Sequence, residues 1–222
     1  MSNRCLFLFV RPRYTLQTLL FLLLFLSLAN LHAVPQSAVI KLSPGLNLLG
    51  LSIDLNQSVS ILELMEQLGG PDKITRVERI NPQTQQTERC EFDPFGAIQG
   101  DACDQLLING EGWMVFAKSP VSIEFNIDTE CPELDLQPGV NLVTFSCAAA
   151  NETSSNLLAK LGDVETIATF QSFDALTGRW LTTVYDHEGK IVGADFPIET
   201  GKSYQVHVHK GTLFNPQDID RD

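Results

Sequence analysis

The chain has 222 residues, of which 27 are acidic and 15 basic, and its net charge is −12. A chain this acidic repels phosphate groups, which argues against nucleic acid and anionic membrane as partners. Its length suits one large domain or two small ones, each with a modest core.

The first 33 residues have the three parts of a secretory signal peptide. Three arginines (Arg4, Arg11 and Arg13) precede an uncharged apolar run of 11 residues, Leu19–Ala29, and the small residue Ala33 follows. An uncleaved membrane anchor is the alternative, but spanning a bilayer takes about 20 apolar residues. We therefore expect cleavage before Val34 and no transmembrane segment afterwards. The remaining 12 basic and 27 acidic residues would give a secreted or periplasmic chain with a net charge of −15.

The exported part repeats itself. Leu42–Leu48 (LSPGLNL) returns 94 residues later as Leu136–Leu142 (LQPGVNL), and the match resumes after it at an offset of 93. Near the end of each copy, Gly110–Val115 matches Gly201–Val206 at an offset of 91. Blocks repeated in the same order predict a tandem duplication. The expected organisation is a signal peptide at 1–33, repeat unit 1 at 34–126, repeat unit 2 at 127–215 and an acidic tail at 216–222.

Each unit begins with a turn between two strands. In Pro44-Gly45 and Pro138-Gly139, proline presets φ for the second turn position and glycine supplies positive φ at the third, as a type II turn requires. Alternating apolar residues on both sides predict strands. We expect the asparagine two residues later, Asn47 or Asn141, to bond back to the turn backbone.

A short helix should follow in each unit. Apolar residues at helical spacing predict one from Ile61 to Leu68, capped by Ser58 or Ser60 and ended by Gly69-Gly70-Pro71. In the second unit the expected cap is Ser154 or Ser155, and Gly162 ends the helix.

The rest of each unit has strand patterns. Alternation predicts strands at 74–80 and 167–173, each leading into a polar turn and further strands. The predicted fold class is α+β, predominantly β: two tandem homologous units, each with antiparallel strands and one short helix.

The repeated motifs resemble a known group of modules. The order Pro-Gly-x-Asn-Leu, short helix, a turn with Asp174, Gly178 and Trp180, then Gly-x-Gly-Trp/Tyr-x-Val is similar to repeat modules of bacterial surface and secreted proteins. These modules often carry a Pro-Gly-Trp-Asn-Leu-Val-Ser-Leu-Pro-like string, from which this chain departs at Leu46 and Val140, where tryptophan is usual. The resemblance implies a non-catalytic accessory role and no particular ligand.

The cysteines also suit export. Without Cys5, four remain (Cys90, Cys103, Cys131 and Cys147), an even number in an oxidising compartment. Two disulfides are predicted, with three pairings open. Pairing neighbours would close loops of about 15 residues, each worth roughly 3 kcal/mol on the chain-entropy model.

No catalytic motif stands out. A serine-hydrolase elbow, G-x-S-x-G, is absent from the sequence, and no cofactor is predicted. The candidate metal ligands are His207 and His209, which alternate on one strand face and would need His187 or Asp186 to complete a set. A solvent-facing strand is the simpler interpretation.

Aromatic residues give the second candidate site. Trp113 and Tyr204 occupy matching positions and are expected in the core. Trp180 has no aromatic counterpart, so Trp180 with Arg179 is the predicted ligand-binding face. The leading functional hypothesis is an exported non-catalytic binding or scaffold module with a structural or surface-association role, whose protein or glycan partner the sequence does not identify. The alternatives are a carbohydrate-binding protein with a glycan partner and a secreted hydrolase with a carboxylate pair that lacks a sequence signature.

Overall fold

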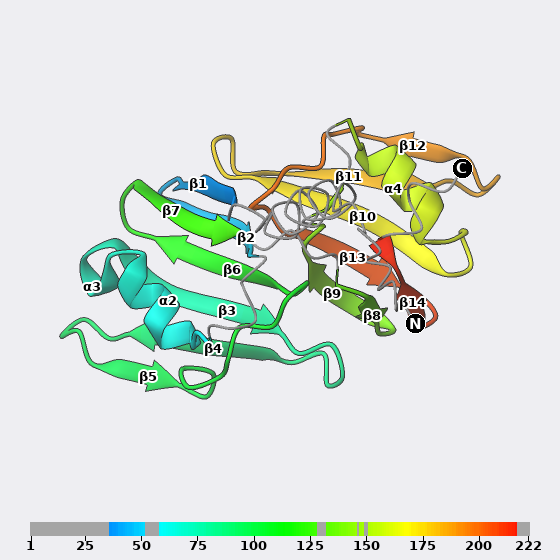
Figure 1. Cartoon of the computed structure of the whole chain (residues 1–222). Helices are drawn as coiled ribbons and strands as arrows, with labels where there is room; N and C mark the ends of the chain where they lie inside the picture. The colour runs from blue at the N-terminus through cyan, green and yellow to red at the C-terminus, as the bar shows by residue number, and fades with distance from the viewer. Residues whose placement is uncertain (1–35, 52–57, 128–131, 146, 149–150, 217–222) are drawn as a thin grey trace, which may run out of the picture. The chain divides into compact units, whose positions relative to one another are not determined.

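Residues 36–51, 58–127, 132–145, 147–148 and 151–216 are described by the computed structural model, and their strands fall into two halves (Figure 1). The first half contains β1 (Gln36–Leu42), β2 (Gly45–Gly50), β3 (Ile74–Ile80), β4 (Thr87–Phe92), β5 (Ile98–Gly100), β6 (Gly112–Ala117) and β7 (Val121–Ile127). The second half contains β8 (Leu134–Leu136), β9 (Gly139–Val143), β10 (Ile167–Asp174), β11 (Arg179–Tyr185), β12 (Ile191–Gly193), β13 (Tyr204–Val208) and β14 (Thr212–Phe214).

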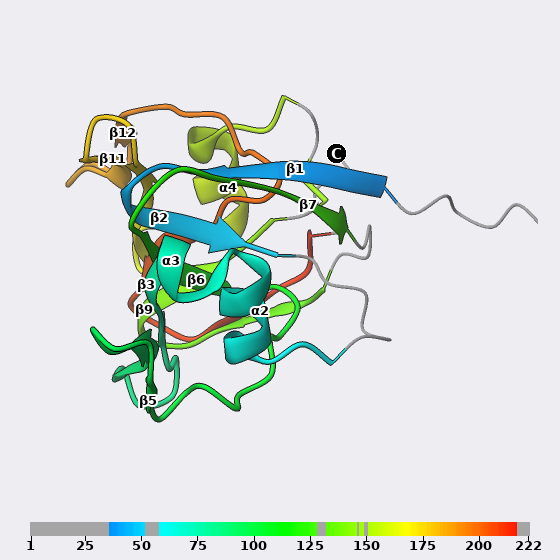
Figure 2. The same cartoon turned by 90° about the vertical axis from the view of Figure 1, so that its left-hand side faces the viewer.

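The two halves share one topology. A five-stranded sheet has the order β2-β6-β3-β4-β5 in the first half and β9-β13-β10-β11-β12 in the second. A separate pair, β1–β7 or β8–β14, accompanies each sheet, and Figure 2 shows β1 and β7 running side by side. The pairings between these strands are antiparallel. The predicted α+β fold dominated by strands is confirmed.

The turn before β2 and its counterpart before β9 have the expected geometry. Gly45 and Gly139 have φ values of 95° and 106°. The Asn47 side chain accepts from the Ser43 N–H at 2.8 Å and donates to the Ser43 carbonyl at 2.8 Å, and Asn141 makes the same two bonds with Gln137 at 2.9 and 2.7 Å. The structural role expected of both asparagines is therefore correct.

The helices differ in detail from the sequence prediction. Helix α2 (Ile61–Gln67) is capped by Ser60, which forms a capping box with Glu63. A second short helix, α3 (Gly70–Lys73), starts where only a helix end was expected, because the fixed φ of Pro71 suits a first turn.

Helix α4 (Ser154–Leu161) is capped by Thr153 and not by Ser154 or Ser155, so that prediction was wrong. Thr153 is extended and accepts from the Asn156 N–H, as an N-cap does. The Ser154 hydroxyl instead points into the core, where it accepts from the Phe196 N–H at 3.1 Å.

Each half has its own hydrophobic core. Helix α2 packs against β3, and α4 packs against β10 and β11 (Figure 1). Trp113 and Tyr204, on matching strands, are fully buried, as expected from their repeated position. Tyr204 stacks on Phe170 with ring centroids 5.3 Å apart.

A disulfide joins Cys90 to Cys103, whose Cα atoms lie 4.7 Å apart. It ties β4 to the loop after β5. In the second half, Thr183 takes the place of Cys90 and donates to the Ser154 hydroxyl at 2.7 Å, so this strand position bonds to the start of α4 and not covalently to the loop. Cys147 is also disulfide-bonded. Cys131 lies outside the described residues, so the second pairing stays a prediction.

The two halves join through reciprocal contacts at the ends of four strands. The Gly50 N–H donates to the Gly201 carbonyl at 3.1 Å, and at the matching positions the Thr144 N–H donates to the Gly110 carbonyl at 2.9 Å. Bridges pair Leu49 with Lys202 and Glu111 with Val143. Because β2 also pairs with β6, and β9 pairs with β13, the ends of these four strands form a closed ring of pairings. We call this contact the junction; it comprises residues 48–50, 110–112, 142–144 and 201–203.

Candidate functional site

Two turns of identical backbone design lie beside the junction. The turn between β3 and β4 starts at Asn81, whose side chain accepts from the Gln83 N–H at 3.0 Å. The turn between β10 and β11 starts at Asp174, which accepts from the Leu176 N–H at 3.0 Å. Each turn faces the β1–β2 or β8–β9 segment of the other half across a cleft.

The two turns differ at one position that decides whether a side chain of the turn reaches the other half. Gln85 has φ 59°, in the left-handed region that favours glycine, and is the sole non-glycine residue with positive φ among those described. Its side-chain oxygen accepts from the Val140 N–H at 2.6 Å, and its amide nitrogen donates to the Val140 carbonyl at 3.2 Å. Gly178 stands at the matching position with φ 66°. The first turn therefore reaches the other half with a carboxamide, and the second turn has no side chain to do so.

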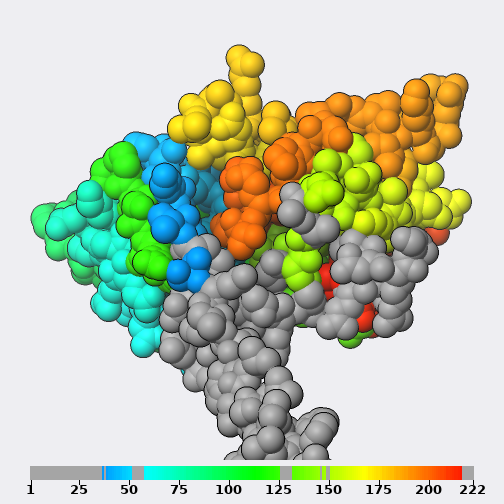
Figure 3. Space-filling view, turned by 45° about the horizontal axis from the view of Figure 1, so that its top comes forward, coloured from blue at the N-terminus to red at the C-terminus, as the bar shows by residue number. Residues whose placement is uncertain are grey.

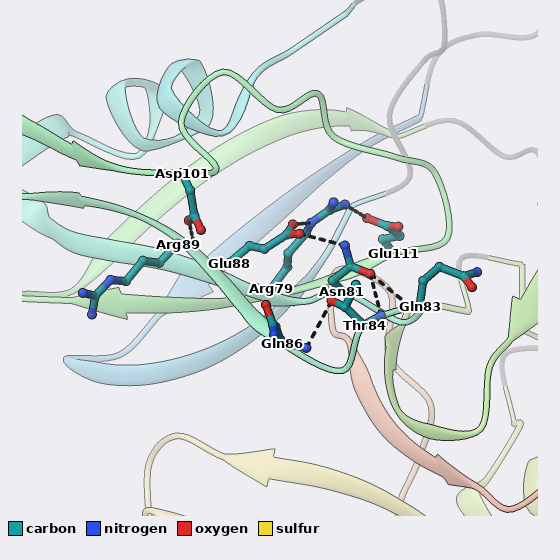
Figure 4. A network of polar contacts seen from close by, with 9 residues as sticks. All are labelled: Arg79, Asn81, Gln83, Thr84, Gln86, Glu88, Arg89, Asp101 and Glu111. Carbon is teal, nitrogen blue, oxygen red and sulfur yellow. Dashed lines mark hydrogen bonds and ion pairs between the residues drawn. The ribbon is translucent and has the colours of Figure 1, made fainter.

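A network of charged and polar side chains lies next to the turn of the first half (Figure 4). The Arg79 guanidinium donates to Glu88 at 2.7 Å and to Glu111 at 2.9 Å, and Asn81 donates to Glu88 at 2.7 Å. The hydrogen bond from Asn81 is the main cause that lowers the pKa of Glu88, whereas burial raises the pKa of Glu111. Because the Arg79 guanidinium bonds to both carboxylates, it holds Glu88 and Glu111 together in one salt-bridge network.

The second half has smaller or apolar residues at these positions. Ser172 replaces Arg79, and Leu181 replaces Glu88. The cleft on this side has a volume of about 540 Å³, against about 270 Å³ for its counterpart. We call them the second cleft and the first cleft. The second cleft is lined by residues of three segments: 40–43 with 47–48, 172–176 with 181, and 196–197 with 199 and 201–203. Figure 3 shows these segments in blue, yellow and orange on one face.

The second cleft carries apolar and charged groups together. Phe173, Leu48 and Phe196 contribute apolar surface, and Leu176 at the turn tip is 86% exposed. Two lysines, Lys41 and Lys202, also line it. In the first cleft the matching residues are Asp135 and Glu111, so the two clefts differ in charge as well as in size.

Strand β2 leaves part of its edge open beside the second cleft. The Gly50 N–H and the Leu48 carbonyl point away from β6, since they bond to Gly201 and Ser203 of the second half. Leu46 lies two residues before Leu48 on this strand, so its N–H and carbonyl also point away from β6. Within the described part of the chain no hydrogen bond joins these two groups to a partner. At the matching Val140, Gln85 satisfies both.

Trp180 lies on the exposed face of the second sheet. It is 42% exposed, pairs with Phe173 across β10–β11, and its ring lies 5.3 Å from that of Phe173. On the same face, Gln205 donates to Gln171 at 3.0 Å, which donates to Thr182 at 2.9 Å. Arg179 precedes Trp180 on β11 and is exposed. The structure thus brings the predicted pair Trp180 and Arg179 to one exposed strand end.

His207 and His209 lie close together, with ring centroids 6.0 Å apart, and both are exposed. Neither residue proposed to complete the set joins them: the His187 side chain lies 3.7 Å from Glu188, and Asp186 accepts from two backbone N–H groups of its own turn. Among the described residues, no group of three His, Cys, Asp or Glu side chains could hold a metal ion. Metal binding by the two histidines stays a prediction.

Sequence reasoning missed the residues that distinguish the two clefts. The difference is visible when the two repeats are aligned, since Gln85 aligns with Gly178 and Arg79 aligns with Ser172. It was not interpretable there, because nothing in the sequence shows that Gln85 reaches Val140.

No family model matches this chain, and neither a curated protein nor a solved structure matches it. No helix in the described ranges is long and apolar enough to cross a membrane.

Proposed function

We propose that the protein is an exported, non-catalytic binding module with a structural or surface-association role, and that the second cleft holds its protein partner. The observation that carries this proposal is the asymmetry of the clefts. One scaffold builds both, but where the first half has Gln85, which bonds to the other half, and the salt-bridged Arg79, the second half has Gly178 and Ser172. An apolar concave surface with a few polar groups is a typical ligand site.

The residue Leu176 offers a direct test, because its counterpart provides a matched control. Leu176 and Gln83 occupy the same position of the two turns, and both are exposed. Peptides selected from a displayed library on the immobilised wild-type protein should bind Leu176→Asp at least about tenfold more weakly, since a charge disrupts an apolar contact. Gln83→Asp should bind them as the wild type does. Equal binding by both variants would refute the second cleft as the site.

The carbohydrate alternative has its own supporting observation. Trp180 presents an exposed ring on a sheet face with Gln171, Thr182 and Gln205, the combination of stacking surface and hydrogen-bonding groups that sugars require. Trp113 is fully buried and serves as an internal reference for fluorescence quenching. Glycan-array binding that is lost in Trp180→Ala and kept in Leu176→Asp would favour this function over the first.

A further inference from the structure

We propose that the open edge of β2 at Leu46 binds the carboxamide of a glutamine or asparagine in an extended peptide of the partner. This inference rests on the proposed function and names the chemistry that the second cleft recognises. The peptide would lie along the free edge of β2 and place its flanking side chains in the cleft.

The molecule itself shows which group fits such an edge. At Val140, the counterpart of Leu46, the Gln85 carboxamide accepts from the N–H at 2.6 Å and donates to the carbonyl at 3.2 Å. A primary amide offers a donor and an acceptor side by side, which matches the N–H and carbonyl of one strand residue. A carboxylate offers acceptors alone, and an ammonium group offers donors alone. The edge therefore selects an amide over either charged group.

The space that Gln85 fills on one side is open on the other. A Cβ built on Gly139 would lie 2.3 Å from the Gln85 side-chain oxygen, whereas a Cβ built on Gly45 meets nothing within 4 Å. A Cβ on Gly178 also meets nothing within 4 Å. The turn of the second half therefore leaves room beside Leu46 for a group that comes from elsewhere.

Continuity with the junction favours a peptide over a small free amide. The same edge of β2 is already paired with the second half at Leu48 and Gly50, in antiparallel register. A carboxamide bound at Leu46 would add hydrogen bonds to the same edge, at the residue two positions before Leu48. The exposed Leu176 and the partly exposed Phe173 offer apolar contact to the neighbouring side chains of the peptide.

A copy of the chain's own turn is a suitable probe. The peptide NPQTQQT repeats residues 81–87, and a control peptide has glutamate at its three glutamine positions. In titrations followed by amide NMR, the glutamine peptide should shift the Leu46 amide signal and slow its hydrogen exchange. The glutamate peptide should bind at least about tenfold more weakly, as expected when one hydrogen bond is replaced by an unpaired acceptor. Equal binding of both peptides, or shifts confined to other residues, would overturn the inference.

A single substitution can supply the missing group from within. Gly178→Gln places a carboxamide at the position and φ of Gln85, so it should protect the Leu46 amide from exchange and exclude the glutamine peptide. Gly178→Ala is the matched control, since it has the same backbone strain and no amide. It should bind the peptide like the wild type and leave the Leu46 amide unprotected. A Gly178→Gln variant that still binds the peptide would refute the site.

These outcomes separate the inference from the proposed function. If library peptides bind the second cleft, as judged by Leu176→Asp, but Gly178→Gln leaves their binding unchanged, the amide site is wrong and the binding module stands. If no peptide binding depends on Leu176, both proposals fail.

Discussion

The Ser203 side chain lies where a side chain on Gly112 would have to be. A Cβ built on Gly112 would stand 2.4 Å from the Ser203 Cβ and 2.7 Å from its hydroxyl oxygen. Gly112 is not among the residues with positive φ, so contact with the other half, and not backbone conformation, requires glycine here. Gly112 in the first half and Ser203 in the second half occupy matching positions of the two repeats.

The first prediction follows from this contact. Gly112→Ala should lower the free energy of unfolding by about 1–3 kcal/mol, because overfilling a packed contact forces its neighbours apart. Adding Ser203→Gly should restore most of the loss by clearing the space. Urea denaturation of the two single variants and the double variant measures the coupling. Additive losses in the double variant would show that the contact does not limit Gly112.

Ser203 itself gives a control for this experiment. Its hydroxyl oxygen is buried and finds no hydrogen-bond partner among the residues that the structure describes. Ser203→Ala should therefore leave stability unchanged or slightly raised, because the hydroxyl loses solvation and gains no partner within the fold.

The second prediction concerns Gln85. Gln85→Ala should destabilise the protein by about 1–2 kcal/mol, because it removes both bonds to Val140 and keeps the unfavourable φ. Gln85→Gly should lose less, since glycine tolerates that φ. In both variants the Val140 amide should exchange faster with solvent, which hydrogen-exchange NMR measures residue by residue. An unchanged Val140 exchange rate would contradict the role assigned to Gln85.

The disulfide supplies the third prediction. Replacing Cys90 and Cys103 together with alanine should lower the free energy of unfolding by about 3 kcal/mol on the chain-entropy model. In the same variant the amides of β4 and β5 should become less protected than those of β11 and β12, because the cross-link belongs to the first half. Uniform loss of protection in both sheets would show that the halves respond as one unit.

The charged network beneath the first turn makes stability depend on pH. The pKa of Glu88 is lowered in the folded state, so its stabilising contribution is present above the unfolded pKa of about 4.3 and is lost as the pH falls through the folded pKa. The pKa of Glu111 is raised by burial, so its contribution is present below about pH 4.3 and is lost as the pH rises through the folded pKa.

The fourth prediction uses these opposite signs. Glu88→Gln should reduce the loss of stability on acidification below about pH 4.3. Glu111→Gln should reduce the loss that occurs as the pH rises above that value. Unfolding free energies measured from pH 3 to pH 7 for the wild type and both variants test this. A Glu111→Gln profile that falls more steeply than the wild type over the upper part of the range would contradict it.

Local patterns predicted the strands, turns and buried aromatics because their causes lie within a few residues. Pro44-Gly45 sets its own turn, and the repeated positions of Trp113 and Tyr204 revealed two cores. Contacts between residues far apart along the chain were not predicted. Gln85 and Val140 are 55 residues apart, and their contact depends on how the two halves dock. Thr153 was missed as a cap because Ser154, a good capping residue by type, is used in the core instead.

The junction also bears on which halves can pair. At its centre the first half presents Gly50 and Gly112, and the second half presents Thr144 and Ser203. Two first halves docked in this way would leave glycine opposite glycine with the space unfilled. Two second halves would force hydroxyl side chains into each other. A chain cut between β7 and β8 should therefore reassemble as a complex of unlike fragments, so each half carries in its sequence a preference for the other over a copy of itself.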